Sequence, residues 1–400
     1  MTTAAFPPSS PVRTRPFPAW PRPPQGLSER LEQLLASGHW WQSGDGAAEE
    51  LESWLRAEHQ ALSCVAVANG TVALEISFRA LDIGPGDEVI VPATTFVSSA
   101  TAVSTVGATP VPVDVDPTTW CLDLDRAAEA LTPRTRAVVV VHLAGQPANL
   151  PAARSFCDRH GLALVEDSAQ ATTASWGAHR VGTVGDITTT SFQAAKLLPG
   201  GDGGAVLIKS DPQLARRVEL LANCGRPRGS GSYAFELIGT NARISEFAAA
   251  TVMAHVAEYE ELWRIRDQTA GRLRRALQCI DPGMVLPPHP EVTRHDWYMF
   301  MLQIPATWRE AGLGNIAFTA HLNAQGIPAA VIYPPWHHVP AYRGALGDTP
   351  VAGHAGEHGI WLHHRLLLDS DTAEDVATAV MHLTEAAAAS ALQPGGHHAH

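Results

Sequence analysis

The stretch from Ala137 to His142 reads Ala-Val-Val-Val-Val-His, a continuous apolar run. A run of this kind is typical of a strand that is buried on both faces of a parallel sheet. The stretch from Leu162 to Asp167 is a second such strand, and the helix-length segment 151–160 lies between the two. Because short apolar strands alternate with helices, the sequence predicts an α/β fold with a large, mainly parallel sheet covered on both faces.

The same alternation extends outward over most of the chain. Further strands are predicted at 88–91, 110–115, 188–192 and 205–208, and further helices at 27–35 and 70–81. A long helical pattern from Ser245 to Leu277 leads to a region that mixes a strand at 298–304 with a helix at 374–386. We interpret this long helix as a link between the sheet and a smaller lobe.

Chain length supports a division into two domains, since four hundred residues exceed the usual size of one hydrophobic core. We predict a proline-rich N-terminal arm at 1–25, a large domain at 26–260, a small C-terminal α/β domain at 261–392 and a disordered tail at 393–400. An arm of this composition is extended, and it either lies across a neighbouring subunit or is disordered.

The composition argues against several classes of function. The net charge is −12 and no basic block offsets it, so neither a nucleic acid nor a membrane is expected as a partner. No apolar run approaches the roughly 20 residues that span a bilayer. The five cysteines are scattered and odd in number, and we find no secretory leader, so we expect reduced thiols and a cytoplasmic protein. The nineteen histidines form no metal-ligand motif, and no metal is expected.

One lysine stands out in a chain that carries two lysines and twenty-six arginines. Lys196 follows the predicted strand at 188–192 and precedes a glycine cluster at 200–204. Arginine cannot replace lysine where a neutral amine attacks a carbonyl, because the guanidinium stays protonated. The position suggests a lysine that forms a Schiff base. A compositional bias that left two lysines at random explains Lys196 by itself equally well.

Three other positions lie at strand ends or at a helix start, where ligands gather in open α/β sheets. Gly70 and Thr71 open a helix whose free N–H groups suit a phosphate, although Gly-Thr before a helix is more often a plain cap. Asp167 ends a buried strand, where a carboxylate either pairs with a positive group such as a pyridinium nitrogen or caps the next helix. Phe96 follows another strand and either stacks on a flat ring or belongs to the core.

Taken in order, these features resemble those of fold-type-I pyridoxal-phosphate enzymes. More closely, the chain is similar to the DegT/DnrJ/EryC1/StrS aminotransferase family over about residues 28–390. The motifs that carry this resemblance are Asn69-Gly70-Thr71, Gly84-Pro85-Gly86-Asp87-Glu88-Val89-Ile90-Val91-Pro92, Val113-Asp114-Val115-Asp116, Glu166-Asp167-Ser168-Ala169-Gln170, Gly185-Asp186-Ile187, Ser191-Phe192 with Lys196, Gly200-Gly201-Asp202-Gly203-Gly204, and Asn241-Ala242-Arg243-Ile244-Ser245-Glu246.

The resemblance implies a fold-type-I architecture, with 26–260 as the domain that binds pyridoxal 5'-phosphate, and a role for each matching residue. Lys196 would form the internal Schiff base and shuttle the proton, and Asp167 would pair with the pyridine nitrogen. Gln170 would contact the hydroxyl side of the ring and Phe96 would cover its face. The phosphate would be held by Gly70, Thr71, Ser191 and, from the neighbouring subunit, Asn241. The resemblance therefore implies a homodimer with shared active sites that binds a small amino donor and a keto acceptor.

A narrower resemblance is to the 3-amino-5-hydroxybenzoate synthase branch, which serves antibiotic pathways. It rests on Ala19-Trp20-Pro21, Gly38-His39-Trp40-Trp41, Ser191-Phe192-Gln193, Cys224-Gly225-Arg226-Pro227-Arg228 and Trp361-Leu362-His363-His364-Arg365-Leu366-Leu367-Leu368. The chain departs from that branch at Gln170, where the branch usually has histidine, at 171–174 and at Ala194-Ala195. Loss of a histidine near the ring changes the acid/base options for an aromatising dehydration.

Three functions follow from this pattern. The favoured one is an aminotransferase that moves an amino group from glutamine or glutamate to a keto-cyclitol, keto-sugar or cyclic keto acid in specialised metabolism. The second is a dehydratase and aromatase of the 3-amino-5-hydroxybenzoate synthase type. The third is a non-catalytic partner protein with the same fold, which only the unusual Thr172-Thr173 and Ala194-Ala195 support.

Candidate substrate contacts are less specific. Arg226, Arg228 and Arg243 are suited to bind a substrate carboxylate bidentately. Alternatively, the Gly-Arg-Pro-Arg loop at 225–228 is solvated or pairs with acids at the dimer interface. His337 and His338 follow Tyr333-Pro334-Pro335-Trp336 and either line the substrate pocket or belong to a structural loop.

Overall fold

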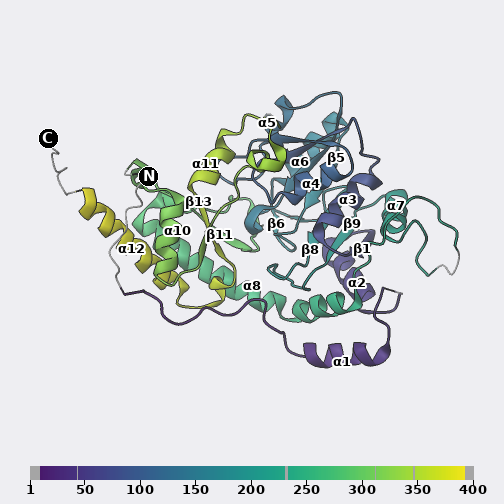
Figure 1. Ribbon diagram of the computed structural model, residues 1–400, viewed down its shortest axis with the longest axis horizontal. Coiled ribbons are helices and arrows are strands. Elements are labelled where there is room, and N and C mark those ends of the chain that lie inside the picture. The colour runs from purple at the N-terminus through teal and green to yellow at the C-terminus, as the bar shows by residue number, and fades with distance from the viewer. Residues whose placement is uncertain (1–9, 43, 230–232, 311, 346, 392–400) are drawn as a thin grey trace.

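The structure, a computed structural model, describes residues 10–42, 44–229, 233–310, 312–345 and 347–391. It has an α/β architecture with a seven-stranded sheet in the right-hand half of Figure 1. The strand order is β1-β9-β8-β5-β4-β2-β3. These strands are β1 (Ser63–Val67), β2 (Glu88–Pro92), β3 (Thr109–Val113), β4 (Thr135–Val141), β5 (Ala163–Asp167), β8 (Ile187–Ser191) and β9 (Gly204–Ile208).

The large sheet is mainly parallel, as the sequence predicted. Only β9 runs against its neighbours, since it pairs antiparallel with both β8 and β1. The other ladders, β3-β2-β4-β5-β8, are parallel. The predicted strands are confirmed to within two residues at each end. The sequence did not predict β1, because the small residues of Ser-Cys-Val-Ala-Val give a weak strand signal.

Helices cover both faces of this sheet because successive residues of each buried strand point to opposite sides. On β4, Val139 packs in one core with α3 and α4, whereas Val138 packs in another with α6. The predicted helices at 27–35, 70–81 and 151–160 are confirmed. The helices of this half are α2 (Ala47–His59), α3 (Gly70–Ala80), α4 (Ser98–Thr105), α5 (Leu124–Glu129), α6 (Leu150–His160) and α7 (Pro212–Ala222).

The long helix α8 (Glu246–Ile280) extends across both halves of the molecule (Figure 1). Val252 and Tyr259 pack in a core with β1 and β9, and Leu273 and Leu277 pack in a second core with the smaller sheet β11-β13-β12. The domain boundary predicted at 260/261 lies inside this unbroken helix and stays a prediction.

The second half is built on that antiparallel three-stranded sheet. Its elements are β11 (Met299–Gln303), α9 (Ala306–Glu310), α10 (Asn315–Ala324), β12 (Ala329–Val331), α11 (Pro350–His358), β13 (Gly359–His363) and α12 (Thr372–Ala391). A third small sheet joins β10 (Val292–Arg294), β6 (Ser175–Trp176) and β7 (His179–Arg180). Short 3-10 turns lie at Leu143–Gly145, Pro282–Met284, Trp336–His338, Pro340–Tyr342 and Leu366–Leu368.

The described part of the N-terminal arm, residues 10–25, follows the small sheet region and then α8 of its own chain (Figure 1). It contains no helix or strand, yet Arg13 and Phe17 are buried. Phe17 belongs to the same core as Leu273 and Leu277. Residues 1–9 and the predicted tail at 393–400 lie outside the described residues.

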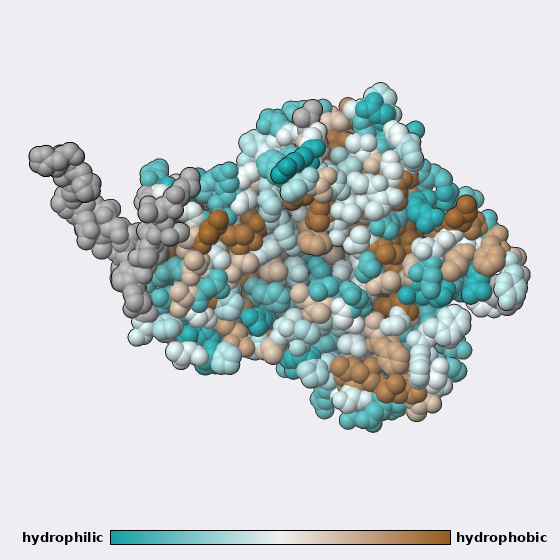
Figure 2. All heavy atoms as spheres, viewed as in Figure 1, coloured by the Kyte–Doolittle hydropathy of each residue, from teal (hydrophilic) through white to brown (hydrophobic). Residues whose placement is uncertain are grey.

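Helix α1 (Leu27–Ser37) lies beneath α8 but buries none of its residues. Figure 2 shows apolar side chains gathered on it, and Leu35, Trp40 and Trp41 are exposed. This apolar surface is not part of a membrane span, because no helix among the described residues is long and apolar enough to cross a bilayer.

Candidate active site

A cavity of about 590 Å³ opens at the carboxyl ends of β5 and β8, beside the first turns of α3 and α4. This is the place where helix N-termini and strand ends converge in an open α/β sheet. The structure brings the following predicted residues together in its lining: Gly70, Thr71, Phe96, Asp167, Gln170, Ser191 and Lys196. Residues that are far apart in the sequence therefore meet in one site.

Lys196 lies in the loop between β8 and β9, and its main-chain N–H donates to the oxygen of Gln193 (2.8 Å). Its Nζ lies 4.5 Å from the ring centroid of Tyr298. Burial lowers the pKa of Lys196 to about 8, against the opposing effect of the Asp167 carboxylate. A substantial fraction of the amine is therefore neutral, and nucleophilic, near neutral pH.

Asp167 ends β5 and is 7% exposed. One carboxylate oxygen accepts from Ser99 Oγ (2.8 Å) and the other from the main-chain N–H of Ala169 (3.1 Å). No arginine or lysine forms an ion pair with it among the described residues. The carboxylate is thus held in place but its charge is left for a positive group in the cavity.

The start of α3 forms a cradle for an anion. Asn69 caps the helix by accepting from the N–H of Val72 (2.9 Å), which leaves the N–H groups of Gly70 and Thr71 at the open end. A Cβ at Gly70 would lie 2.9 Å from Cβ of Ser191, so glycine is required for that serine to approach. Two main-chain donors and a hydroxyl therefore converge at one point.

Aromatic rings border the rest of the cavity. Phe96 is 53% exposed and lies 5.8 Å from Tyr333 between ring centroids. Tyr298 lies beside Lys196, and burial raises its pKa to about 12. Sequence reasoning missed both tyrosines, because they lie far along the chain from the other lining residues and no local motif marks them.

Gln170 and Ser99 complete the floor. Gln170 Oε1 accepts from the main-chain N–H of Ala144 (2.7 Å), which fixes the amide and leaves its nitrogen as the free donor. Ser99 lies in the first turn of α4 and bonds both Thr95 (3.0 Å) and Asp167. The sequence analysis did not select Ser99, although its place in the first turn of a helix after β2 is a signal of the same kind as Gly70-Thr71.

The structure does not bring the six remaining candidates to this cavity. Asn241 is exposed, and its side-chain oxygen accepts from the N–H of Arg243 (3.4 Å). Arg243 in turn donates to Asn223 (2.9 Å). The role of Asn241 in a neighbouring subunit and the substrate roles of Arg226 and Arg243 stay predictions.

Arg228 is engaged elsewhere in its own chain. Its guanidinium forms a bidentate pair with Glu52, at 2.6 and 2.8 Å. Glu52 is 1% exposed; burial raises its pKa, and Arg228 opposes that shift. Arg228 thus pairs with an acid of its own chain, which ties the 224–229 segment to α2, and its substrate role stays a prediction.

His337 and His338 lie in a 3-10 turn away from the cavity. The Nε2 of His337 lies 3.3 Å from the hydroxyl of Thr349, and burial lowers its pKa to about 4. The ring is therefore neutral at physiological pH. The placement matches the structural-loop alternative, and a substrate role for either histidine stays a prediction.

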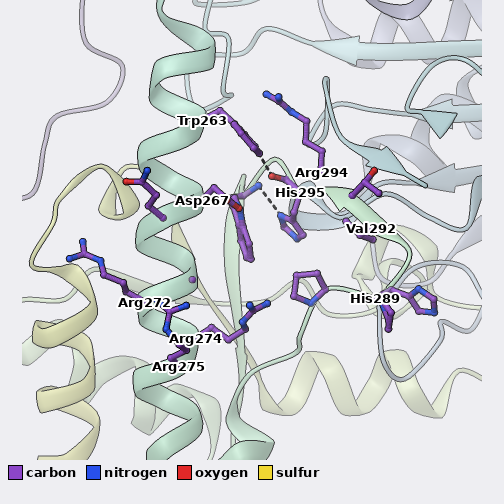
Figure 3. A pocket seen from close by; sticks show the side chains of 15 residues that line it. Trp263, Asp267, Arg272, Arg274, Arg275, His289, Val292, Arg294 and His295 are labelled. Atoms are coloured by element: carbon purple, nitrogen blue, oxygen red, sulfur yellow. Dashed lines mark hydrogen bonds between the residues drawn. The ribbon is translucent and has the colours of Figure 1, made fainter. Parts of the chain in front are cut away.

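A second cavity, of about 920 Å³, lies between α8 and residues 288–297 (Figure 3). Two hydrogen bonds in its lining belong to the fold: Trp263 Nε1 donates to the oxygen of His295, and the N–H of Trp297 donates to His295 Nδ1, each at 2.9 Å. Burial lowers the pKa of His295 to about 3. No lysine lies among the residues described as lining it, so the predicted chemistry belongs to the first cavity.

Comparisons with known proteins agree with this geometry. Residues 25–381 match the model of the DegT/DnrJ/EryC1/StrS aminotransferase family. The chain belongs to this family. It is 36% identical over 380 residues to 3-amino-5-hydroxybenzoate synthase of Amycolatopsis mediterranei, which covers 91% of this chain and 97% of that protein.

Two further relatives show how the family extends. The chain is 37% identical over 407 residues to L-glutamine:2-deoxy-scyllo-inosose aminotransferase of Streptoalloteichus tenebrarius, covering 93% of this chain and 95% of that one. A crystal structure of 3-amino-5-hydroxybenzoic acid synthase matches with a TM-score of 0.86 at 35% identity, over 92% of this chain and 100% of that one. The predicted family and fold class are confirmed. The chain is an enzyme of this family, so the non-catalytic hypothesis is not supported.

The family depends on pyridoxal phosphate, and the cavity fits that group. Lys196 supplies an amine with a lowered pKa, and Asp167 is a buried carboxylate without a cationic partner. The Gly70 cradle suits a phosphate, since a Cβ there would fill it. The cavity therefore offers a partner for the ring nitrogen, the carbonyl and the phosphate of that group.

The shifted pKa of Lys196 predicts its chemical reactivity. In competitive acetylation of the cofactor-free protein, we expect the reactivity of Lys196 to rise with pH and level off above about pH 8, because its amine is half neutral there. Peptide mass spectrometry measures the yield at each pH, with the exposed Lys209 as internal reference. A Lys196 yield that still climbs tenfold per unit beyond pH 9 would contradict the shift.

The Arg228–Glu52 pair predicts a stability effect. Arg228→Ala leaves a buried carboxylate without its cation, and we expect the free energy of unfolding to fall by about 3 kcal/mol. Arg226→Ala, two residues away, removes a side chain that forms no ion pair among the described residues, and it should change the free energy of unfolding by less than about 0.5 kcal/mol. Denaturant unfolding measures both; equal values would show that the pair does not stabilise the fold.

Proposed function

We propose that this protein is a pyridoxal-phosphate-dependent aminotransferase. It moves an amino group from L-glutamine or L-glutamate to a cyclic ketone, namely a keto-cyclitol, a keto-sugar or a cyclic keto acid, in specialised metabolism such as antibiotic biosynthesis. The observation that carries the proposal is one cavity in which an amine of lowered pKa and an unpaired buried carboxylate lie beside an anion cradle.

Each residue has a defined task in this proposal. The bound cofactor supplies an electron sink for the carbon that carries the amino group. Asp167, held by Ser99 and Ala169, keeps the ring nitrogen protonated. The N–H groups of Gly70 and Thr71 and the hydroxyl of Ser191 hold the phosphate. Lys196 would hold the cofactor through its amine and would carry the transferred proton on Nζ.

Transamination suits this cavity better than an aromatising dehydration. No histidine lies among the described residues that line it. Gln170 is the lining residue that would lie near the ring, and an amide neither gives nor takes a proton at neutral pH. Lys196 is therefore the main proton carrier, and amino transfer needs no other. Relatives named as L-glutamine-dependent aminotransferases support glutamine as the donor.

A second candidate is a dehydratase and aromatase of the 3-amino-5-hydroxybenzoate synthase type. It is supported by the 36% identity and the TM-score of 0.86 to proteins of that name. In that case Lys196 acts as a base without net transfer of an amino group. The two candidates differ in whether an amino donor is consumed.

We further propose a homodimer with shared active sites. α1 buries no residue, and Leu35, Trp40 and Trp41 are exposed on or just after it. Phe235 and Ile238 are exposed on the surface of the 233–240 segment, and we expect a second copy to cover such apolar groups. Asn241 lies close in sequence to this surface and is exposed. Asn241 does not line the cavity of its own chain, and its exposed side chain is available to the cavity of a neighbouring subunit.

A half-reaction tests the proposed function. The purified protein with pyridoxal phosphate should show the visible absorbance of a lysine-linked cofactor, and L-glutamine without any keto acceptor should bleach it. Lys196→Ala should abolish both the covalent link and turnover, a loss of at least about 10³-fold, whereas Lys209→Ala should keep them. Borohydride reduction and peptide mass spectrometry identify which lysine is modified.

Other results of that experiment point elsewhere. Turnover by K196A at the wild-type rate would rule out the proposal. A visible band that ignores glutamine and glutamate, with an aromatic product formed from an added amino-dehydroquinate and no amino donor consumed, would establish the second candidate.

Mixing two inactive variants tests the shared site. K196A and Asn241→Ala, unfolded and refolded together, should regain about a quarter of wild-type activity, because half the dimers are hybrids with one intact cavity. The matched control is K196A mixed with Asp167→Asn. If both residues serve the cavity of their own chain, each hybrid dimer has two damaged cavities, and this mixture should regain no activity. Recovery in neither mixture would contradict a shared site at Asn241.

A further inference from the structure

Two consecutive main-chain carbonyls beside the candidate lysine are bonded by side chains from outside the large sheet. Trp20 Nε1, from the N-terminal arm, donates to the oxygen of Lys196 at 3.0 Å. His364 Nε2, from the segment after β13, lies 3.1 Å from the oxygen of Ala195. Since a carbonyl only accepts, the imidazole carries its proton on Nε2. The backbone that carries Lys196 is therefore fixed by residues far away in the sequence.

The two donors also contact each other. The ring of Trp20 meets that of His364 edge-on, with centroids 4.7 Å apart at 85°. His364 is fully buried, and burial holds the pKa of its imidazole well below the ordinary value. The neutral ring is thus locked between Trp20 and the Ala195 carbonyl.

A buried arginine explains why a tryptophan occupies this position. Arg266 of α8 is 0% exposed, and none of its three guanidinium nitrogens has a hydrogen-bond partner among the described residues. Its Cζ lies 5.7 Å from the ring centroid of Trp20. An aromatic face partly offsets the cost of burying a cation. Trp20 therefore serves two groups, Arg266 through its face and Lys196 through its N–H.

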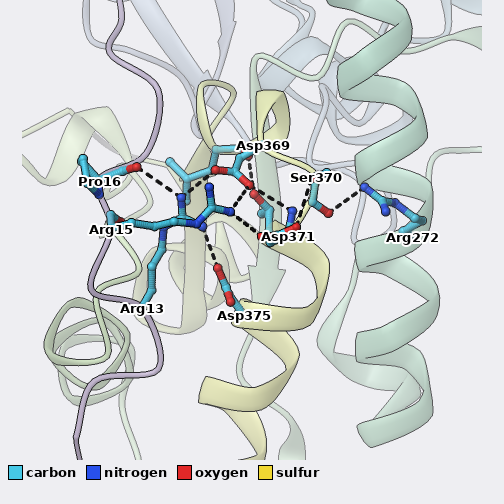
Figure 4. Close-up of polar contacts among 10 residues, drawn as sticks. Arg13, Arg15, Pro16, Arg272, Asp369, Ser370, Asp371 and Asp375 are labelled. Atoms are coloured by element: carbon cyan, nitrogen blue, oxygen red, sulfur yellow. Dashed lines mark hydrogen bonds and ion pairs between the residues drawn. The ribbon is translucent and has the colours of Figure 1, made fainter.

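Upstream of Trp20 the arm is anchored by ion pairs (Figure 4). Buried Arg13 contacts Asp369 and Asp375, each at 2.6 Å, and Arg15 also reaches Asp369, at 2.9 Å. Phe17 packs in the core of the small sheet region. Asp369 follows His364 by five residues, so the segment that holds the arm is the one that holds Ala195.

Downstream of Trp20 the arm is anchored on α8. Arg22 contacts Glu258 at 2.6 Å, and the main-chain N–H of Gln25 donates to the same carboxylate at 3.0 Å. Trp20 lies between these two anchors. Its N–H is consequently fixed by both halves of the molecule rather than by a free chain end.

We propose that Trp20 is a positioning residue for Lys196, and that residues 12–25 form a strap that transmits the position of the small sheet region to the lysine. This rests on the proposed function, in which Lys196 carries the cofactor and the transferred proton. The lysine amine is carried on a flexible four-carbon stem, so the position of its main chain sets the region that Nζ can reach. Small errors in the position of such a group reduce turnover strongly.

A matched pair of substitutions tests the donor. Trp20→Phe keeps an aromatic ring over Arg266 but removes the N–H, whereas Trp20→His keeps an N–H at the corresponding position of a five-membered ring. Both replace the two-ring indole by a single ring, and only W20H carries an N–H that can donate to the Lys196 carbonyl. The variants are studied as full chains loaded with pyridoxal phosphate.

The informative readouts are the visible circular dichroism per lysine-linked cofactor, and kcat and KM for L-glutamine. We expect W20F to lose at least half of the visible circular dichroism and roughly tenfold in kcat, with KM unchanged within about twofold. W20H should stay within about threefold of wild type in kcat. If Trp20 had a purely structural role, W20F would lower the melting temperature but would change neither the visible circular dichroism nor kcat, each taken per covalently linked lysine. Equal signals in W20F, W20H and wild type would overturn the proposal.

Arg13→Ala tests the strap without touching Trp20, in case substitution at Trp20 prevents folding. Hydrogen exchange of residues 10–25 should increase, and the visible circular dichroism should fall in the same direction as in W20F. A released strap with an unchanged signal would overturn the proposal. The proposed function fails separately: if the wild-type protein forms no borohydride-reducible link at Lys196, the function is wrong before any strap variant is measured.

Discussion

The buried carboxylate of Asp167 is the constraint around which the site is arranged. It lies at the end of β5 with two hydrogen-bond donors and, among the described residues, no cationic side chain in contact. Such a charge is costly in a protein interior unless a positive ligand compensates it. Ser99 on α4 fixes the carboxylate, and the first turn of α3 and the Lys196 loop surround the remaining space. The first turns of α3 and α4 thus lie beside the carboxyl end of β5, where Asp167 is held.

Lys196 is subject to two opposing effects in the same cavity. Burial lowers the pKa of its amine, and the nearby negative charge of Asp167 raises it; burial prevails, at about 8. An amine in this range is present partly as a nucleophile and partly as an acid, which suits a group that both binds a carbonyl and moves a proton. The ring of Tyr298 lies beside Nζ and is one of the groups that line the cavity around it.

Segments far from the large sheet in sequence also contact the Lys196 loop and the cavity. Trp20 precedes Lys196 by more than 170 residues and His364 follows it by a similar number, yet both bond neighbouring carbonyls of one loop. Tyr298 and Tyr333 reach the cavity from the second half of the chain in the same way. These contacts connect the arm, the long helix and the small sheet region to the lysine, so the architecture outside the large sheet bears directly on the chemistry inside it.

The sequence by itself determined the strands of the large sheet and the residues at their carboxyl ends. Short apolar runs specify buried parallel strands, and parallel strands bring their ends to one edge, so Gly70, Asp167, Ser191 and Lys196 were predictable from local pattern and motif. Only the tertiary structure decided that Arg228 pairs with Glu52, that His337 lies away from the cavity and that Trp20 bonds Lys196. These are contacts between side chains far apart in sequence; no local periodicity encodes them, because they depend on how separately formed elements pack.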